Sequence, residues 1–211
     1  MGSTEDPWQQ VRTRNGLAAD EVISGLQKSI RRSDVDEAVA FAWEMYLTSP
    51  ELEDFLWLRL QVISVEDIGF GEVNAPVLVD ALNRMRREFA QSAPDRPLFF
   101  VHAVRYLCAQ PKDRSSDMLR NIVELEFDRG RRPVIRDHML DMHTRRGQQL
   151  GRGIEHFLDE ASVVAPRKPG AHEQYELRLR ALIGGAPSHA DRAGDGSSVR
   201  GGVPVPEQHD E

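Results

Sequence analysis

The chain has 211 residues, and 40% of them are hydrophobic, which suffices for the core of one ordinary domain and hardly for two. Its 27 Lys and Arg residues are outnumbered by 34 Asp and Glu residues, which leaves a formal net charge of −7. This charge excludes a basic surface over the whole molecule for non-specific nucleic-acid binding, although a local basic patch remains compatible with it. The single cysteine, Cys108, excludes an internal disulfide and a four-thiolate zinc site, and it fits a reducing compartment, so a cytoplasmic protein is expected.

The N-terminal segment is polar and contains no apolar run, so we expect neither a signal peptide nor a membrane anchor there. Residues 1–16 are predicted to be a flexible N-terminus. No stretch of the sequence approaches the roughly 20 uncharged apolar residues that a bilayer-spanning helix needs. We therefore expect no membrane partner.

Helical spacing of apolar residues dominates the first two thirds of the chain. A first helix is predicted through Val22 and Ile30, with Asp20 as its N-cap. A second helix is predicted to begin at Ser33, because Ser33-Asp34-Val35-Asp36 follows the capping-box pattern. Its expected buried stripe consists of Val35, Val39, Trp43 and Tyr46 or Leu47.

The next two helices are predicted from proline at their first turns, where the missing N–H costs nothing. Ser49-Pro50 opens a helix to about Asp67 that is apolar nearly all round, and Gly69 and Gly71 end it. Ala75-Pro76 opens a helix whose three arginines are expected to face water. The apolar side of that helix is expected to contain Val77, Leu78, Leu82, Met85 and Phe89, and the arginines are Arg84, Arg86 and Arg87.

The apolar run at residues 98–109 is predicted to be a helix, because it is long for a strand and no partner strands are evident. Another helix is predicted over Ser116–Asp128. Its residues expected inside the core are Met118, Leu119, Ile122, Val123 and Leu125. These elements define an all-α compact helical domain over residues 17–130.

The pattern weakens after Gly130. Residues 131–183 are predicted to be an irregular and partly helical extension packed on the domain, with short helices near 154–160 and 172–183. Residues 184–211 are rich in Gly, Ser, Pro and Asp and poor in large apolar residues, so we expect a disordered tail.

Few residues of the sequence match a pattern that carries chemistry. No Gly-x4-Gly-Lys-Ser/Thr loop occurs, which excludes ATP hydrolysis by the usual phosphate-binding loop. Gly69-Phe70-Gly71 is too short for a dinucleotide fingerprint and is typical of a helix end. Cys108 lies in an apolar run, so an inert buried thiol is expected. Glu66 and Asp67 are adjacent on a helix and point about 100° apart, so they are expected to be structural and not to converge on one substrate.

A histidine-rich segment offers the alternative function, a metal-dependent or other enzyme that uses residues 137–159. His138 and His143 are separated by five positions, which does not align two ligands on one helix face as a spacing of four does. We therefore expect surface histidines, no metal and no cofactor. The other side chains considered as ligands are Asp141, His156 and Asp159.

Two groups of basic residues are candidates for nucleic-acid or partner contact. The first group stands at the end of the first helix, where the helix dipole alone explains cations. The second stands in the irregular segment, where function often lies. The groups are Lys28, Arg31 and Arg32, and then Arg131, Arg132, Arg145 and Arg146.

Three runs of sequence resemble the C-terminal domain of the MgsA/RarA family, replication-associated AAA+ ATPases related to the Werner-helicase-interacting protein. Ser29-Ile-Arg-Arg-Ser-Asp-Val-Asp-Glu-Ala38 is similar to Lys-Ser-Ile-Arg-x-Ser-Asp-x-Asp-Ala in the family. Val62-Ile-Ser-Val-Glu-Asp-Ile-Gly69 contains Ser-x-Glu-Asp-Ile-Gly, similar to Ser-Glu-Asp-Ile-Gly. Tyr106-Leu-Cys-Ala-Gln-Pro-Lys112 is similar to Tyr-Leu-x-x-Ala-Pro-Lys. Order and spacing agree over about residues 17 to 125, and the motif residues expected to be structural are Ser33, Asp34, Asp36, Glu66, Asp67, Gly69, Pro111 and Lys112.

The resemblance implies an all-α domain of the clamp-loader C-terminal type, the oligomerisation domain that follows an AAA+ module. The AAA+ motor itself has no counterpart in these 211 residues, so the resemblance does not imply an ATPase. It implies a non-catalytic module that forms a homo-oligomer, a tetramer in the family, and that docks on DNA or on replication and repair proteins. A separate AAA+ ATPase is a further expected partner.

Overall fold

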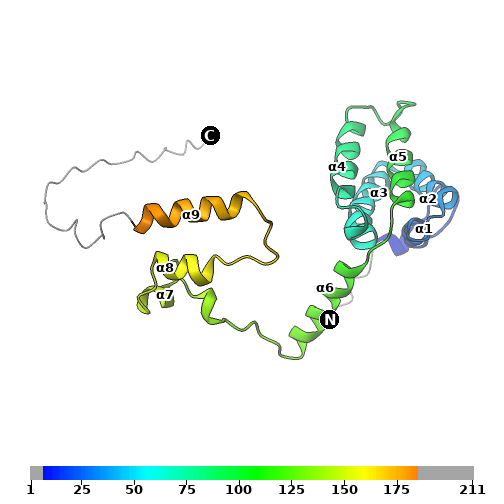
Figure 1. The fold of residues 1–211 in the computed structure, drawn as a ribbon. Helices are drawn as coiled ribbons and strands as arrows, with labels where there is room; N and C mark the ends of the chain where they lie inside the picture. Colours follow the sequence, from blue (N-terminus) through cyan, green and yellow to red (C-terminus); the bar gives the residue numbers. More distant parts are fainter. Residues whose placement is uncertain (1–6, 185–211) are drawn as a thin grey trace, which may run out of the picture. The chain divides into compact units, whose positions relative to one another are not determined.

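The structure is a computed structural model, and it describes residues 7–184 of the chain. Helices account for all the regular structure in this range, which confirms the predicted all-α class (Figure 1). The chain divides into two compact units, Met1–Pro133 and Val134–Glu211. No helix within residues 7–184 is both long and apolar enough to cross a bilayer.

The first unit is a bundle of five helices, α1 to α5, followed by α6, which Figure 1 shows extending away from the bundle. Trp57 of α3 and Phe100 of α5 are the largest apolar side chains in its buried core. The elements of this unit are η1 (Pro7–Gln10), α1 (Ala19–Arg31), α2 (Val35–Thr48), α3 (Pro50–Ile63), the π-helical turn η2 (Ser64–Ile68), η3 (Gly69–Gly71), α4 (Ala75–Arg86), α5 (Arg96–Ala109) and α6 (Ser115–Asp128).

Residues 7–16, which we predicted as part of a flexible N-terminus, are instead attached to the bundle. The ring of Trp8 lies 5.0 Å from the ring of Phe55 on α3. Thr13 is buried, and the backbone N–H of Ala19 donates to the carbonyl oxygen of Val11 at 3.0 Å. These contacts hold the segment against the start of α1.

The helices begin close to the positions that the sequence patterns predict, but the capping residues are only partly those predicted. Ser49 caps α3 as predicted, because its hydroxyl accepts from the Leu52 N–H at 3.2 Å. Asp20 was predicted wrongly as the cap of α1, since Ala18 occupies that position without a side-chain bond. Asp34, rather than Ser33, caps α2, because Ser33 adopts φ +61° and turns the chain two residues before the helix begins at Val35.

Two predicted stripes are shifted around their helices. On α2 the fully buried face is made of Ala38, Ala42 and Met45, whereas Trp43 and Leu47 are exposed. Glycine at position 25 of α1 allows α2 to approach closely, since a Cβ there would come within 2.6 Å of the Phe41 ring of α2. On α4 the expected apolar residues Val77 and Met85 are exposed.

Arg86, which we expected to face water, is one of the largest fully buried side chains of the bundle. It forms an ion pair with buried Glu53 of α3 at 3.3 Å and lies over the Trp57 ring. Arg96, at the start of α5, binds the same carboxylate, donating to Oε1 at 2.9 Å and to Oε2 at 3.2 Å. The prediction failed because a charged residue is buried only when a partner is supplied by another element, which the pattern of one helix does not reveal.

α6 differs most from expectation. None of its residues is buried, and the five side chains predicted to lie inside are between 37% and 61% exposed. Its tertiary contacts within the unit are mainly with η2. The amphipathic pattern is present, but no part of residues 7–184 covers its apolar face.

The second unit consists of short helices and one longer one. Its elements are η4 (Asp137–Met139), α7 (Arg145–Gln149), α8 (Ile154–His156), η5 (Phe157–Ala161) and α9 (Ala171–Gly184). The short helix predicted near 154–160 and the last one predicted over 172–183 are both present. The guanidinium of Arg152 donates to the carbonyl oxygens of Asp137 and Leu140 and ties the loop before α7 to the loop after it. The tail predicted to be disordered lies, apart from Gly184, outside the described residues.

Candidate functional site: the motif junction

The three motif runs, far apart in the sequence, meet at one place in the first unit. The turn between α1 and α2, the π-helical turn η2 and the segment 110–114 after α5 contact one another there, and we call this place the motif junction. The Asp113 N–H donates to the carbonyl oxygens of Asp67 at 3.0 Å and Ile68 at 3.2 Å. Gly69 has φ +50°, and a Cβ there would lie 2.3 Å from the Asp113 oxygen, so the close backbone approach requires glycine.

Lys112 joins the end of α5 to the α1–α2 turn. Its ammonium donates to the carbonyl oxygens of Leu107 and Cys108, both at 3.1 Å, and to Gln110 at 2.5 Å. These carbonyls stand at the C-terminus of a helix, where oxygen atoms lack intrahelical partners and the dipole favours a cation. Ser33 completes the connection, since its hydroxyl donates to the Cys108 oxygen at 2.7 Å and accepts from Lys112 at 3.2 Å.

Two arginines bind both carboxylates of η2. Arg31 of α1 forms ion pairs with Glu66 at 3.3 Å and with fully buried Asp67. Arg114 reaches the same groups at 3.6 Å and 3.5 Å, and Gln27 donates to the second oxygen of Asp67 at 2.9 Å. The two carboxylates, adjacent in the sequence, thus meet the same arginines, because a π-helical turn separates adjacent side chains less than an α-helix and the arginines are long.

The polar side chains of the motif junction hold the surrounding elements together through ion pairs and hydrogen bonds. Arg31 and Arg114 are paired with Glu66 and Asp67, and Lys112 is bound by backbone carbonyls. The hydrogen bond to Asp67 raises the pKa of Arg31. Burial lowers the pKa of Lys112 and raises the pKa of the Cys108 thiol to about 11. The thiol is therefore protonated at neutral pH and is not an activated nucleophile.

The remaining motif residues lie at the edge of the same region. Asp36 is exposed in the first turn of α2, where a carboxylate stabilises the positive end of the helix. The carbonyl oxygen of Pro111 lies against η3, and a Cβ on Gly71 would come within 2.3 Å of it. Sequence reasoning missed Arg114 and Gln27, and no local signal marks them, because their partner Asp67 lies about 40 residues or more away.

The first basic group is only partly available for contact. Arg31 is engaged by Glu66 and Asp67, and the Lys28 ammonium is hydrogen-bonded to the Ser24 hydroxyl. Lys28 and Arg32 are exposed.

The second basic group is divided between the two units. Arg131 and Arg132 lie in the first unit and Arg145 and Arg146 in the second, and all four are exposed. Arg131 forms an ion pair with Glu126 of α6.

The histidine segment does not form a ligand set. His143 Nδ1 lies 2.7 Å from Asp141, and its hydrogen bond lowers the pKa of that carboxyl. Within residues 7–184 no three His, Cys, Asp or Glu side chains are grouped as metal ligands would be.

The fold and the motif junction define a class of protein, an all-α helical module whose sequence motifs hold helices together. A scan against protein-family models finds no match for the chain. The chain is 31% identical to replication-associated recombination protein A of Bacillus subtilis over 144 residues, which are 68% of this chain and 33% of that protein. It is also 28% identical to an uncharacterised AAA-domain-containing protein of Mycobacterium tuberculosis over 159 residues, which are 74% of this chain and 34% of that protein.

These matches confirm the resemblance expected from the three motifs. The chain is a homologue of replication-associated recombination protein A, consistent with the C-terminal domain of that family. It spans about a third of the length of both curated relatives.

Proposed function

We propose that this chain is a non-catalytic association module that acts in replication-associated recombination and forms a homo-oligomer through α6. The exposed apolar face of α6 carries the proposal. A helix with apolar residues at positions i, i+3 and i+4 gains its stability mainly from packing that face, and α6 has no such packing within residues 7–184. The exposed apolar residues are Met118, Leu119, Ile122, Val123, Leu125 and Phe127.

A second exposed apolar area lies beside the start of α6. A hollow of about 200 Å³ lies beside the start of α6, lined in part by Val65, Phe70 and Val73. All three side chains are exposed. Exposed apolar surface of this kind is typical of protein interaction sites.

Sedimentation velocity across micromolar concentrations tests the proposal. The wild-type chain is expected to associate, and Leu119→Asp is expected to shift it to monomer. Val77→Asp is the matched control, because Val77 is also a highly exposed apolar residue of the first unit and lies in the first turn of α4. A wild-type chain that stays monomeric throughout this range contradicts the proposal.

DNA docking is the second candidate, favoured by the exposure of the four arginines of the second basic group. Electrostatic contacts of this kind are strongest at low salt. We expect a quadruple Arg→Gln variant at residues 131, 132, 145 and 146 to lose binding to forked DNA in 50 mM salt. Absence of binding by the wild-type chain under those conditions overturns this candidate.

A further inference from the structure

We propose that α6 of one copy packs parallel to α5 of a second copy, in the groove beside α4, so that the oligomer is joined head to tail. This inference rests on the proposed function and specifies which two surfaces meet. It is carried by a correspondence between the exposed faces of α5 and α6.

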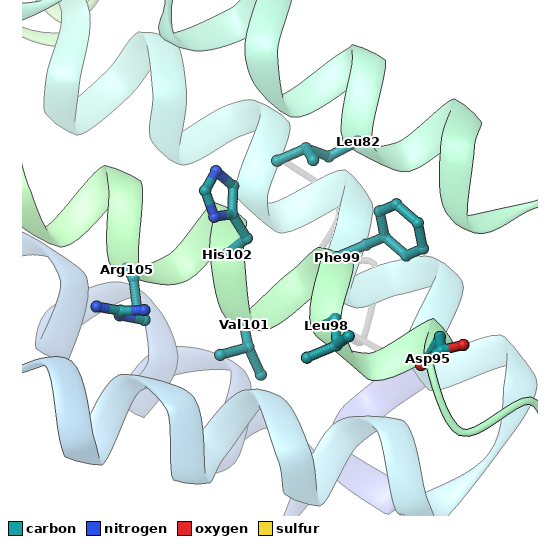
Figure 2. A pocket seen from close by; sticks show the side chains of 7 residues that line it. All are labelled: Leu82, Asp95, Leu98, Phe99, Val101, His102 and Arg105. Carbon is teal, nitrogen blue, oxygen red and sulfur yellow. The ribbon is translucent and has the colours of Figure 1, made fainter.

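The groove lies along the outer face of α5 (Figure 2) and has a volume of about 380 Å³. Leu98, Val101 and Arg105 follow one another along α5, and Leu82 of α4 contributes to the apolar lining. Leu98 is 63% exposed. Arg105 is exposed and makes no ion pair or hydrogen bond within residues 7–184. The groove therefore offers an apolar floor with an uncompensated cation at its C-terminal end.

The face of α6 has the same periodicity with the opposite charge. Leu119, Ile122, Val123 and Glu126 occupy positions i, i+3, i+4 and i+7. Glu126 thus projects from within the apolar stripe and not from the polar side of the helix. Its present partner Arg131 lies just beyond the end of α6, and that ion pair is exposed.

The two faces match residue by residue in a parallel register. Leu98, Val101, His102 and Arg105 of α5 also stand at i, i+3, i+4 and i+7. Leu119 then meets Leu98, Ile122 and Val123 meet Val101 and His102, and Glu126 meets Arg105. Seven residues of helix span about 10.5 Å, which places the apolar contact and the ion pair two turns apart on both helices. An antiparallel arrangement would bring Glu126 to Leu98 and leave Arg105 without a partner.

The same molecule does not supply this contact. The start of α6 is fixed at the motif junction. There the backbone N–H of Asp113 donates to the carbonyl oxygen of Asp67, and Arg114 forms ion pairs with Glu66 and Asp67. From there α6 packs on η2, and the connection 110–114 is too short and too firmly held for α6 to turn back along its own α5. A second copy is therefore the occupant. An interface between two different surfaces of identical chains is head to tail and forms closed rings or open filaments.

A charge exchange tests the register. Arg105→Glu and Glu126→Arg each remove the proposed ion pair between copies, and each is expected to weaken self-association about tenfold. The double variant restores opposite charges and is expected to return to within about threefold of wild type. Both side chains are exposed or half-buried, so circular dichroism is expected to show an unchanged fold. A double variant as weak as the single variants overturns the proposed register.

A mixing experiment tests the head-to-tail arrangement. Leu98→Asp blocks the groove and Leu119→Asp blocks α6, so each variant alone is expected to be monomeric. Mixed together, they retain one intact surface each and are expected to form a 1:1 dimer that does not grow. A mixture that stays monomeric, while the wild-type chain associates, overturns this inference but not the proposed function. A monomeric wild-type chain overturns both.

Discussion

Asp67, fully buried in η2, receives the Arg31 guanidinium from α1 and thereby fixes the first helix against the end of the third. The pair links two of the sequence motifs that resemble the family. Gln27 donates to the second oxygen of the same carboxylate at 2.9 Å. The geometry explains why a fully buried carboxylate stands in this motif.

Replacing Asp67 by Asn is expected to lower the free energy of unfolding by about 2–3 kcal/mol, because charged hydrogen bonds to two elements are lost. The arginines are partly exposed and regain water, which limits the loss. Urea unfolding followed by circular dichroism measures it. The control is Asp80→Asn, which breaks the exposed pair with Arg84 and is expected to change stability by less than about 0.5 kcal/mol. Equal effects of the two substitutions would refute the structural role of Asp67.

The buried network of Glu53, Arg86 and Arg96 is expected to be the most sensitive part of the first unit. Glu53→Gln removes the carboxylate that the buried guanidinium groups of Arg86 and Arg96 share, while Arg86 keeps its ion pair with Asp54, and we expect a loss of about 3 kcal/mol. Thermal unfolding measures the effect. Glu124→Gln, in the exposed pair with Arg120, is the control. A melting temperature for Glu53→Gln within one or two degrees of the control would contradict the assigned role.

Ser33 holds a left-handed backbone conformation and two hydrogen bonds, and two substitutions separate these effects. Ser33→Ala removes both bonds while keeping a Cβ at φ +61°, so we expect a loss of about 1–2 kcal/mol. Ser33→Gly removes the same bonds but relieves the backbone strain, so its loss is expected to be smaller. Chemical denaturation of the two variants side by side tests this order, and a larger loss for Gly than for Ala would reverse it.

Cys108 gives a prediction about alkaline pH. Burial raises the pKa of its thiol to about 11 from an ordinary value of 9.0, so the folded chain binds this proton more tightly than the unfolded chain. The stabilisation that comes from this protonated thiol is therefore fully present below pH 9 and is lost as the pH rises towards 11. The difference in unfolding free energy between wild type and Cys108→Ala is expected to shrink over that interval. A difference independent of pH would rule out this linkage.

Thiol reactivity provides a second measurement on the same residue. At pH 8 the folded chain is expected to react with iodoacetamide much more slowly than the urea-unfolded chain, because the thiol is buried and protonated. Rapid labelling of the folded chain would contradict this.

Local patterns in the sequence determined the positions of the helices. Ser49-Pro50 and Ala75-Pro76 mark starts that the structure reproduces, because proline at the first turn and a capping hydroxyl act within a few residues. Glycine at position 69 marks the end of the third helical stretch for the same reason. Periodicity likewise identified residues 98–109 as helix.

Only the tertiary structure decided which helix faces are buried. Arg86 is inside because Glu53 and Trp57 of another helix receive it, and the apolar residues of α6 are outside because its anchored start leads it away from the bundle. The convergence of Arg31 and Arg114 on Asp67 likewise depends on elements tens of residues apart. Periodicity specifies that a helix has an apolar face, whereas the partner for that face is set by the path of the whole chain and by the surfaces of other molecules.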